Sequence, residues 1–499
     1  MRKTPLGLLV LLPLCLASCG PASHGPAKMP PAFLQTDSPA APPSAAKAVA
    51  APPLVASEAF ELEKARKFLA GGGAANSAPP EELSQATRLH QAATYGWFRV
   101  AELLLDHRAD INALDKDRRT PLATAVDHRF AALAQLLIER GADIHLADVH
   151  GNTPLHYAVR EDMVGIAEML LVRGADANGR PQGGLGRPIN VAAWAGNPAV
   201  IDLLVAHGAR VDQDQGNCFT LHQALRYGHP EAAKALVRHG AKLDVFSAAG
   251  LGDTAYLRTC LGKDKQWARD MANSEIMASL SSTHTPLDFA AINNQVRAAE
   301  MLLDAGADPN RPLRGEQPVL NIAAEKDYRD LATLLLARGA KIDAPYEMQG
   351  SGTALHAAAA ANHPEMIDLL IRHGAKVDSR DYGAMTPLLR AAEHGWVPAV
   401  KALLDRGADL HARSAQGDTA LHIVEHESWR REQDGYDMAR FLLEKGAEVN
   451  ARNAEGRTPL DDVNSDRIKE LLRRHGARSG KDLPAADGGP QAKEQGGKE

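Results

Sequence analysis

A Gly-Ala pair recurs along this 499-residue chain at a nearly constant spacing. Most intervals between successive pairs are 30 to 35 residues, and one interval of 66 residues equals two periods with a marker missing. The pairs begin at residues 141, 174, 208, 240, 306, 339, 374, 407, 446 and 476. A repeat of this size is too small to bury an apolar core alone, so successive repeats must stack into a solenoid.

Each repeat also carries the signals of two short helices. In one repeat, Thr153 suits an N-cap, Pro154 suits the first helical turn, and Ala158 leaves room for a neighbouring helix. An apolar stripe over residues 166–171 predicts a second helix, which Gly174 ends because glycine adopts the left-handed conformation without strain. The low aromatic content, 4% of the residues, fits a core of closely packed Ala and Leu.

The motifs GNTPLHYAV at 151–159 and LLVRGADAN at 170–178 resemble an ankyrin repeat. The resemblance extends over residues 84–478, about four-fifths of the chain. It implies an all-α fold, an ankyrin-repeat α-solenoid of about twelve helix-turn-helix units with β-hairpin-like loops. It also implies a structural hydrogen-bonding role for the histidine that ends each Thr-Pro-Leu-His-like start, which here is His90, His156, His222, His356 and His422.

Two units depart from the pattern. The sixth unit, near 245–280, lacks the Thr-Pro start, and a long loop is expected at 262–282, where the repeats could divide into two blocks. The eleventh unit has about six additional residues near 428–435. The sequence therefore predicts a signal peptide at 1–18, a Pro/Ala-rich tether at 19–56, an N-terminal capping helix and loop at 57–83, repeat blocks at 84–244 and 245–478, and a disordered tail at 479–499.

The N-terminal sequence predicts where the protein is targeted. Arg2 and Lys3 precede an apolar run that is too short to span a bilayer. The run ends in Leu-Ala-Ser-Cys, which resembles the lipobox of bacterial lipoproteins and implies cleavage before Cys19 and lipidation of its sulfur. Gly20 is not the Asp that retains such proteins at the inner membrane, so the resemblance implies an outer-membrane protein that faces the periplasm. The alternative is an ordinary secretory signal with an incidental cysteine.

The residue pattern predicts neither catalysis nor a cofactor. The net charge of −6 gives no basic field for nucleic acid. The pair His422 and His426 lacks the order of a zinc-protease motif, so no metal site is expected. The four cysteines exclude a disulfide scaffold, although Cys218 and Cys260 could be either two thiols or a disulfide.

What remains is a surface for a protein partner. In ankyrin arrays the hairpin tips and the first helix of each unit line the concave side, and aromatic residues are frequent binding hot spots. The resemblance places eleven candidate contact residues there: Tyr95, Trp97, Lys116, Asp117, Arg119, His150, Asn152, Trp194, Tyr227, Tyr382 and Trp396. The partner would be a protein of unknown identity, with no small-molecule substrate, and the chain itself a monomer.

Three functions fit these observations. The first is a membrane-anchored protein–protein interaction scaffold of the bacterial cell envelope. The second is an immunity protein that binds and neutralises a toxin. The third is an enzyme or metal protein whose site lies in the irregular segments 262–282 and 428–435. We favour the first.

Overall fold

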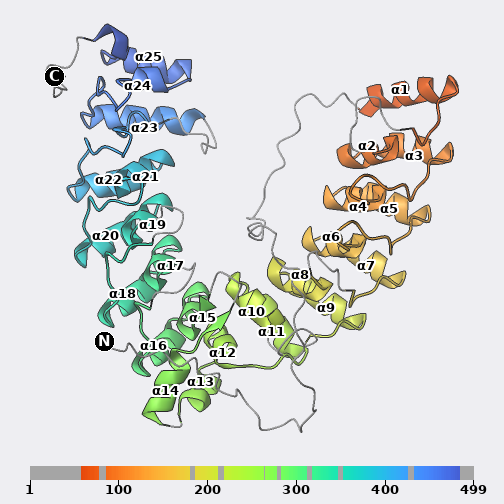
Figure 1. Ribbon diagram of the computed structural model, residues 1–499, viewed down its shortest axis with the longest axis horizontal. Helices are drawn as coiled ribbons and strands as arrows, with labels where there is room; N and C mark the ends of the chain where they lie inside the picture. Colours follow the sequence, from red (N-terminus) through yellow and green to blue (C-terminus); the bar gives the residue numbers. More distant parts are fainter. Residues whose placement is uncertain are drawn as a thin grey trace, which may run out of the picture. The chain divides into compact units, whose positions relative to one another are not determined.

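The computed structural model describes residues 58–77, 86–179, 186–211, 219–262, 264–277, 283–311, 317–346, 352–424 and 432–483. Within these ranges the chain is nearly all-helical, and the helices follow one another in antiparallel pairs (Figure 1). The first helices of the units are α2 (Arg88–Tyr95), α4 (Pro121–Asp127), α6 (Pro154–Arg160), α8 (Pro188–Ala195), α10 (Phe219–Arg226), α12 (Val245–Leu251), α15 (Pro286–Ile292), α17 (Val319–Glu325), α19 (Ala354–Ala360), α21 (Pro387–Glu393) and α24 (Pro459–Asp462).

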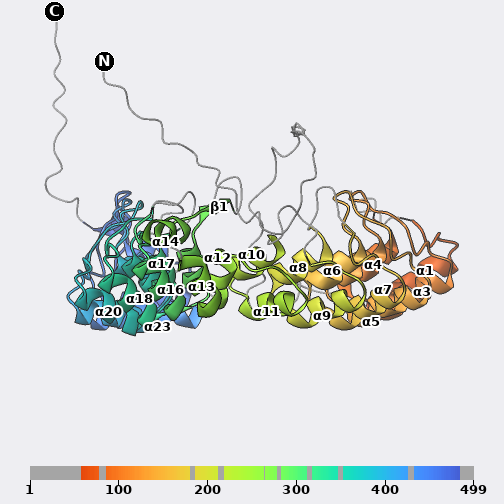
Figure 2. The same ribbon diagram turned by 90° about the horizontal axis from the view of Figure 1, so that it is seen from below.

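The second helices form a parallel layer beside the first. They are α3 (Phe98–Asp106), α5 (Ala131–Glu139), α7 (Val164–Val172), α9 (Pro198–Ala206), α11 (Pro230–Arg238), α13 (Thr254–Leu261), α16 (Val296–Asp304), α18 (Arg329–Ala337), α20 (Pro364–Arg372), α22 (Val397–Asp405), α23 (Glu432–Glu444) and α25 (Asp466–Arg474). Figure 2 shows the loops between units on one side of the helices. The expected solenoid of helix-turn-helix units is confirmed.

Local sequence sets the ends of these helices. The Thr120 hydroxyl accepts a hydrogen bond from the N–H of Ala123 at 3.1 Å, and Pro121 occupies the first helical position. At the end of α5, Gly141 has a φ of 86°, which lets the next N–H, of Ala142, bond back to the carbonyl of Leu137 at 3.0 Å. Each unit is therefore a short, firmly bounded helix pair.

One hydrophobic core runs through the stack. First helices pack on the first helices of neighbouring units, as α2 does on α4 and α4 on α6. Small and branched side chains meet there, and Ala158, Ala192 and Leu355 are fully buried. Because alanines let the helices approach closely, the core needs few aromatic rings.

The two ends of the stack are closed by partial units. Helix α1 (Glu58–Ala70) forms where a capping helix is expected and packs on α3, and Asn76 accepts a hydrogen bond from the N–H of Asp110 at 2.5 Å. At the other end, Arg452 donates to the carbonyls of Gly480 and Leu483. The tail expected to be disordered from residue 479 is therefore ordered as far as 483, with a short 3₁₀ helix at Gly480–Asp482.

The sixth unit contains structure where a loop is expected. The segment 262–282 includes helix α14 (Lys265–Ala272) and strand β1 (Ile276–Met277), which pairs antiparallel with β2 (Thr283–His284). Asn273, after α14, donates to the carbonyl of Gly306 at 2.9 Å and accepts from the N–H of Asp308 at 3.0 Å. Asn310 makes the same two bonds one unit later, to Gly339 and Lys341. Helix α14 therefore completes the sixth unit, and Asn273 substitutes for the asparagine that follows the missing Gly-Ala marker.

The eleventh unit is also irregular. Residues 420–424 form turns and a bend instead of a first helix, and α23 begins at Glu432, so half of the additional segment 428–435 is helical. The signal peptide at 1–18, Cys19, the tether at 19–56 and Cys218 lie outside the described residues, so their assignments stay predictions. No described helix has the length and apolar character needed to cross a membrane.

Candidate protein-binding surface

The histidines of the repeats hold neighbouring units together. His156 Nδ1 accepts from the N–H of Thr153 at 3.1 Å, so Nε2 carries the proton and donates to the carbonyl of Gly179 at 3.3 Å. The same arrangement joins His90 to Arg119, His356 to Met385 and His422 to Arg457. Burial lowers the pKa of His156, His356 and His422, which keeps these rings neutral. The structural role expected for these histidines is confirmed.

His422 also belongs to a cluster that has the outline of a metal site. Donor atoms of Asp418, His422 and Asp462 lie within 4.8 Å of one another. Both nitrogens of His422 are already engaged in the bonds described above, however. Asp418 accepts from the side-chain amide of Asn453 at 2.9 Å, and Asp462 pairs with Arg457 at 2.9 Å. The cluster is therefore a satisfied hydrogen-bond network, and its donors do not fit a metal ion.

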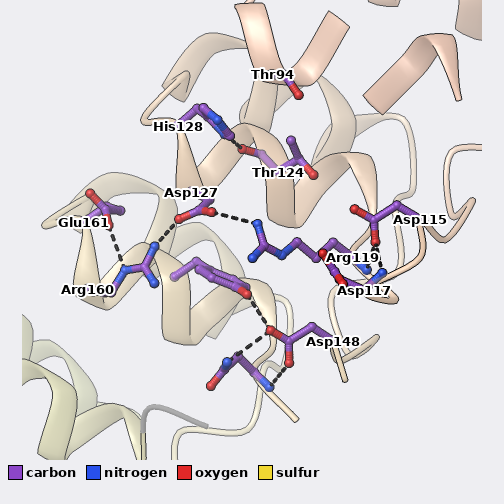
Figure 3. A network of polar contacts seen from close by, with 12 residues as sticks. Thr94, Asp115, Asp117, Arg119, Thr124, Asp127, His128, Asp148, Arg160 and Glu161 are labelled. Atoms are coloured by element: carbon purple, nitrogen blue, oxygen red, sulfur yellow. Dashed lines mark hydrogen bonds and ion pairs between the residues drawn. The ribbon is translucent and has the colours of Figure 1, made fainter. Parts of the chain in front are cut away.

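A ladder of alternating charges lies on the first-helix side of the second and third units (Figure 3). Asp127 lies between two guanidinium groups, those of Arg119 at 3.2 Å and of Arg160. Arg160 also pairs with Glu161 at 2.8 Å. Although burial opposes its charge, the pairing with Asp127 raises the pKa of Arg160. Because these charges are mutually compensated, this part of the face is polar without a strong net charge.

A buried carboxylate organises the hairpin of the third unit. Asp148 accepts from the backbone N–H groups of His150 and Asn152, each at 2.8 Å, and from the hydroxyl of Tyr157 at 2.5 Å. These bonds outweigh burial and lower the pKa of Asp148. Burial and the bond to Asp148 raise the pKa of Tyr157, which therefore stays a donor. The hairpin is therefore fixed by bonds from its own backbone and by a bond from its first helix.

The hairpin of the tenth unit has the same plan with a different donor. Asp381 accepts from the N–H groups of Gly383 at 2.9 Å and Met385 at 3.0 Å. Arg390 binds the same carboxylate at 2.6 Å and reaches Glu393 at 2.9 Å. In both units the carboxylate and its helical donor are nine residues apart, as 148 is from 157 and 381 from 390. The nine-residue spacing is a signal in the sequence by which these two residue pairs could have been found.

Several of the predicted contact residues offer little surface. Trp97 is only 8% exposed and Asn152 only 6%, so each offers little surface to a partner, and their role as contacts stays a prediction. Trp97 stacks on Tyr95, with ring centroids 4.8 Å apart, and the side-chain amide of Asn152 donates a hydrogen bond to Asp148. The indole of Trp396 donates to the carbonyl of Ala360 in the preceding unit at 2.8 Å and so has a structural bond.

The other predicted contact residues are accessible to different degrees. Trp194 and Tyr227 pack edge to face with centroids 6.0 Å apart and are half-buried. Lys116 and His150 are exposed, whereas Asp117 and Arg119 are half-buried at the base of their hairpin. Tyr95 is 42% exposed, and Tyr382 is 93% exposed at its hairpin tip. Whether these residues bind a partner stays a prediction.

Family models confirm what the geometry indicates. The model for ankyrin repeats in three copies matches residues 55–148, 89–181, 320–414 and 355–453, and the single-repeat model matches 219–247 and 283–312. Together these matches cover more than half of the chain. The chain belongs to the ankyrin-repeat family. Ankyrin repeats are scaffolds for protein–protein interaction, and this is the general function of this ankyrin-repeat protein.

Individual relatives are similar only over short regions. The ankyrin repeat protein nuc-2 of Neurospora crassa is 28% identical over 149 residues, which are 30% of this chain and 11% of that protein. The putative ankyrin repeat protein FPV014 of fowlpox virus is 28% identical over 130 residues, 26% of this chain and 29% of that protein. The matches thus span less than a third of either relative. The ankyrin repeat domain of Bcl-3 aligns over 46% of this chain and 98% of its own, with 26% identity and a TM-score of 0.40.

Proposed function

We propose that this ankyrin-repeat protein is a lipid-anchored scaffold of the bacterial cell envelope that binds a protein partner through its hairpins and first helices. The observation that carries the proposal is the combination of rigid hairpins with exposed side chains at their tips. The hairpins of the third and tenth units are fixed by Asp148 and Asp381, and they display residues such as His150 and Tyr382. A preorganised surface loses little conformational entropy when it binds.

The anchoring part of the proposal rests on the N-terminal sequence alone. The Leu-Ala-Ser-Cys motif would place a lipid on Cys19, and Gly20 favours sorting to the outer membrane. The Pro/Ala-rich segment 20–56 would then separate the repeats from the membrane, with a reach of up to about 100 Å at ~3.1 Å per residue. The repeats would act as a non-enzymatic binding surface in the periplasm.

Two measurements test this function. Metabolic labelling with palmitate should mark the full-length protein and should fail for Cys19→Ser, with the Cys218→Ser variant as the matched control. Crosslinking in native envelopes should then capture one protein in stoichiometric amount with the wild type. Absence of label on the wild type would contradict the lipid anchor, and absence of any captured protein, with the envelope intact, would contradict the scaffold.

A further inference from the structure

The contact between the carboxylate of a hairpin and a donor nine residues later on the first helix, here called the nine-residue clamp, is present in some hairpins and absent from others. In the third and tenth units, a donor on the first helix, Tyr157 or Arg390, binds the carboxylate that holds the hairpin. In the second unit the corresponding helical residue is Thr124, whose hydroxyl bonds instead to the carbonyl of Thr120 at 3.1 Å. In this hairpin the carboxylate of Asp115 accepts from the backbone N–H groups of Asp117 and Arg119, and Thr124 does not bond to it.

The clamped hairpins display apolar tips. The residue directly after the clamped carboxylate is Val149, 52% exposed, in the third unit and Tyr382, 93% exposed, in the tenth. The same position in the unclamped second unit is Lys116. Holding an aromatic ring in water on a rigid turn forgoes the free energy of burying it, which contact with a partner would recover. Tyr382 is the most exposed large apolar residue in the part of the chain that the structure describes.

A row of guanidinium groups lies along the hairpins of the last three units. Arg380 donates to the carbonyls of Ala384 and Arg413, at 3.0 and 2.7 Å. Arg413 repeats this one unit later, to Gly417 and Arg452, and Arg452 does so with Gly480 and Leu483. Arg413 has Glu448 at 3.8 Å, whereas Arg380 and Arg452 have no carboxylate within 4.0 Å among the described residues. These cations are thus held in place by uncharged carbonyls.

We propose that the hairpin of the tenth unit is the docking point for an acidic segment of a protein partner, which buries the ring of Tyr382 and sets its carboxylates against Arg380 and Arg413. Arg390 is a positioning residue, because it acts on Tyr382 only through Asp381, whose side chain is fully buried. The inference rests on the proposed scaffold function and names the partner's chemistry. An acidic partner fits because Arg380 is exposed with no carboxylate within 4.0 Å among the described residues, and Arg413 has only the exposed Glu448 at 3.8 Å.

The test uses the full-length protein and a random 12-residue peptide library displayed on phage. Selection on the wild type, with depletion on Tyr382→Ala, should enrich peptides that are rich in Asp and Glu beside an apolar residue. A labelled peptide of the selected consensus is then titrated by fluorescence anisotropy. Its Kd should rise by about 30-fold for Tyr382→Ala, the effect of a hot-spot residue, and should rise steeply with salt. Phe60→Ala, which removes an exposed aromatic ring on α1, is the matched control and should leave the Kd unchanged.

The positioning role has its own readout. Arg390→Gln should weaken the peptide several-fold and speed hydrogen exchange at the N–H groups of Gly383 and Met385. Arg390→Lys, which keeps a cation for Asp381, should restore most of the affinity. A selection that leaves no peptide after depletion on Tyr382→Ala, or selected peptides without acidic residues, would overturn the proposal. If the envelope partner is still captured by Tyr382→Ala in full, this docking point is wrong while the scaffold function stands.

Discussion

The junction between the ninth and tenth units and the junction between the fifth and sixth join their helices by different chemistry. In the former, neutral His356 is fixed by Thr353 and donates to the backbone carbonyl of Met385 at 3.0 Å. In the latter, Phe219 occupies the place of the threonine, and His222 reaches the carboxylate of Asp244 at 2.8 Å. A hydrogen bond to backbone tolerates any side chain in the next unit, whereas the second arrangement depends on one acidic residue.

The layers around the sixth unit differ as well. Its first helix, α12, keeps its neighbours so close together that the side-chain amide of Asn293, in the seventh unit, donates to the carbonyl of Leu225, in the fifth, at 2.8 Å. Gly250 in α12 faces Leu225 so closely that an added Cβ would meet its side chain at 3.1 Å. The second helix, α13, buries only Leu257, whereas α11 buries four residues and α16 four. In the sixth unit the inner layer, formed by the first helices, is therefore tightly packed, and the outer layer, formed by the second helices, is weakly held.

The largest effect should come from breaking a regular junction. His356→Ala removes the bonds to Thr353 and Met385 and leaves a cavity in a nearly fully buried site. We expect a loss of about 2–4 kcal/mol in the free energy of opening of the ninth and tenth units. Native-state hydrogen exchange measures it unit by unit. His222→Ala, at a site with an 18% exposed side chain, should cost less, and an equal cost would remove the distinction between the junctions.

Acidification should affect the two junctions at different pH. Burial lowers the folded-state pKa of His356, so its contribution to stability is complete above the unfolded-state pKa of 6.5 and declines as pH falls below it. For Asp244, burial is outweighed by the hydrogen bond and charge of His222, so its lowered pKa keeps its contribution until pH falls below 3.8.

Denaturation at pH 7.5 and at 5.5 checks this expectation. The wild type should lose stability over this interval because His156, His356 and His422 are protonated in the unfolded chain at a higher pH than in the folded protein. His356→Gln should show a smaller loss, since one of the three groups no longer titrates. The same loss in the variant and the wild type would contradict the assignment.

The smallest effect should come from the asparagine bonds between units. Asn273→Ala and Asn310→Ala each remove two partly exposed bonds, so each should cost about 1 kcal/mol. The two values should agree if Asn273 does serve as the missing asparagine of the sixth unit. Thermal denaturation of the two variants side by side makes the comparison. A neutral Asn273→Ala beside a costly Asn310→Ala would show that α14 does not complete the unit.

The sequence predicted the parts of the fold that depend on short-range signals. Thr-Pro starts and left-handed glycines fix helix ends locally, so the helix pairs were predicted from the residues, and the resemblance to ankyrin repeats predicted the structural histidines. Helix α14 was missed because Lys265–Ala272 carries no repeat marker, and its place is set by packing on α13.

The surface was harder to predict than the fold. Trp97 directly follows the glycine that ends α2, but its burial depends on Tyr95 and on the core beneath. Tyr382 was found because a hairpin tip is exposed by its position in the repeat. Its support by Asp381 and Arg390 depends on side-chain reach across the hairpin, which a local pattern does not express.

Hydrogen–deuterium exchange over the sixth unit tests the central claim most directly. The claim is that the units are held chiefly through their first helices, and that the outer layer is weakest where α13 and α14 replace one regular helix. Exchange at 254–272 should be faster than in α11 and α16, while α12 stays as protected as α15 because it packs against both α10 and α15. Equal protection of α13, α14 and the neighbouring second helices, or early opening of α12, would contradict the account.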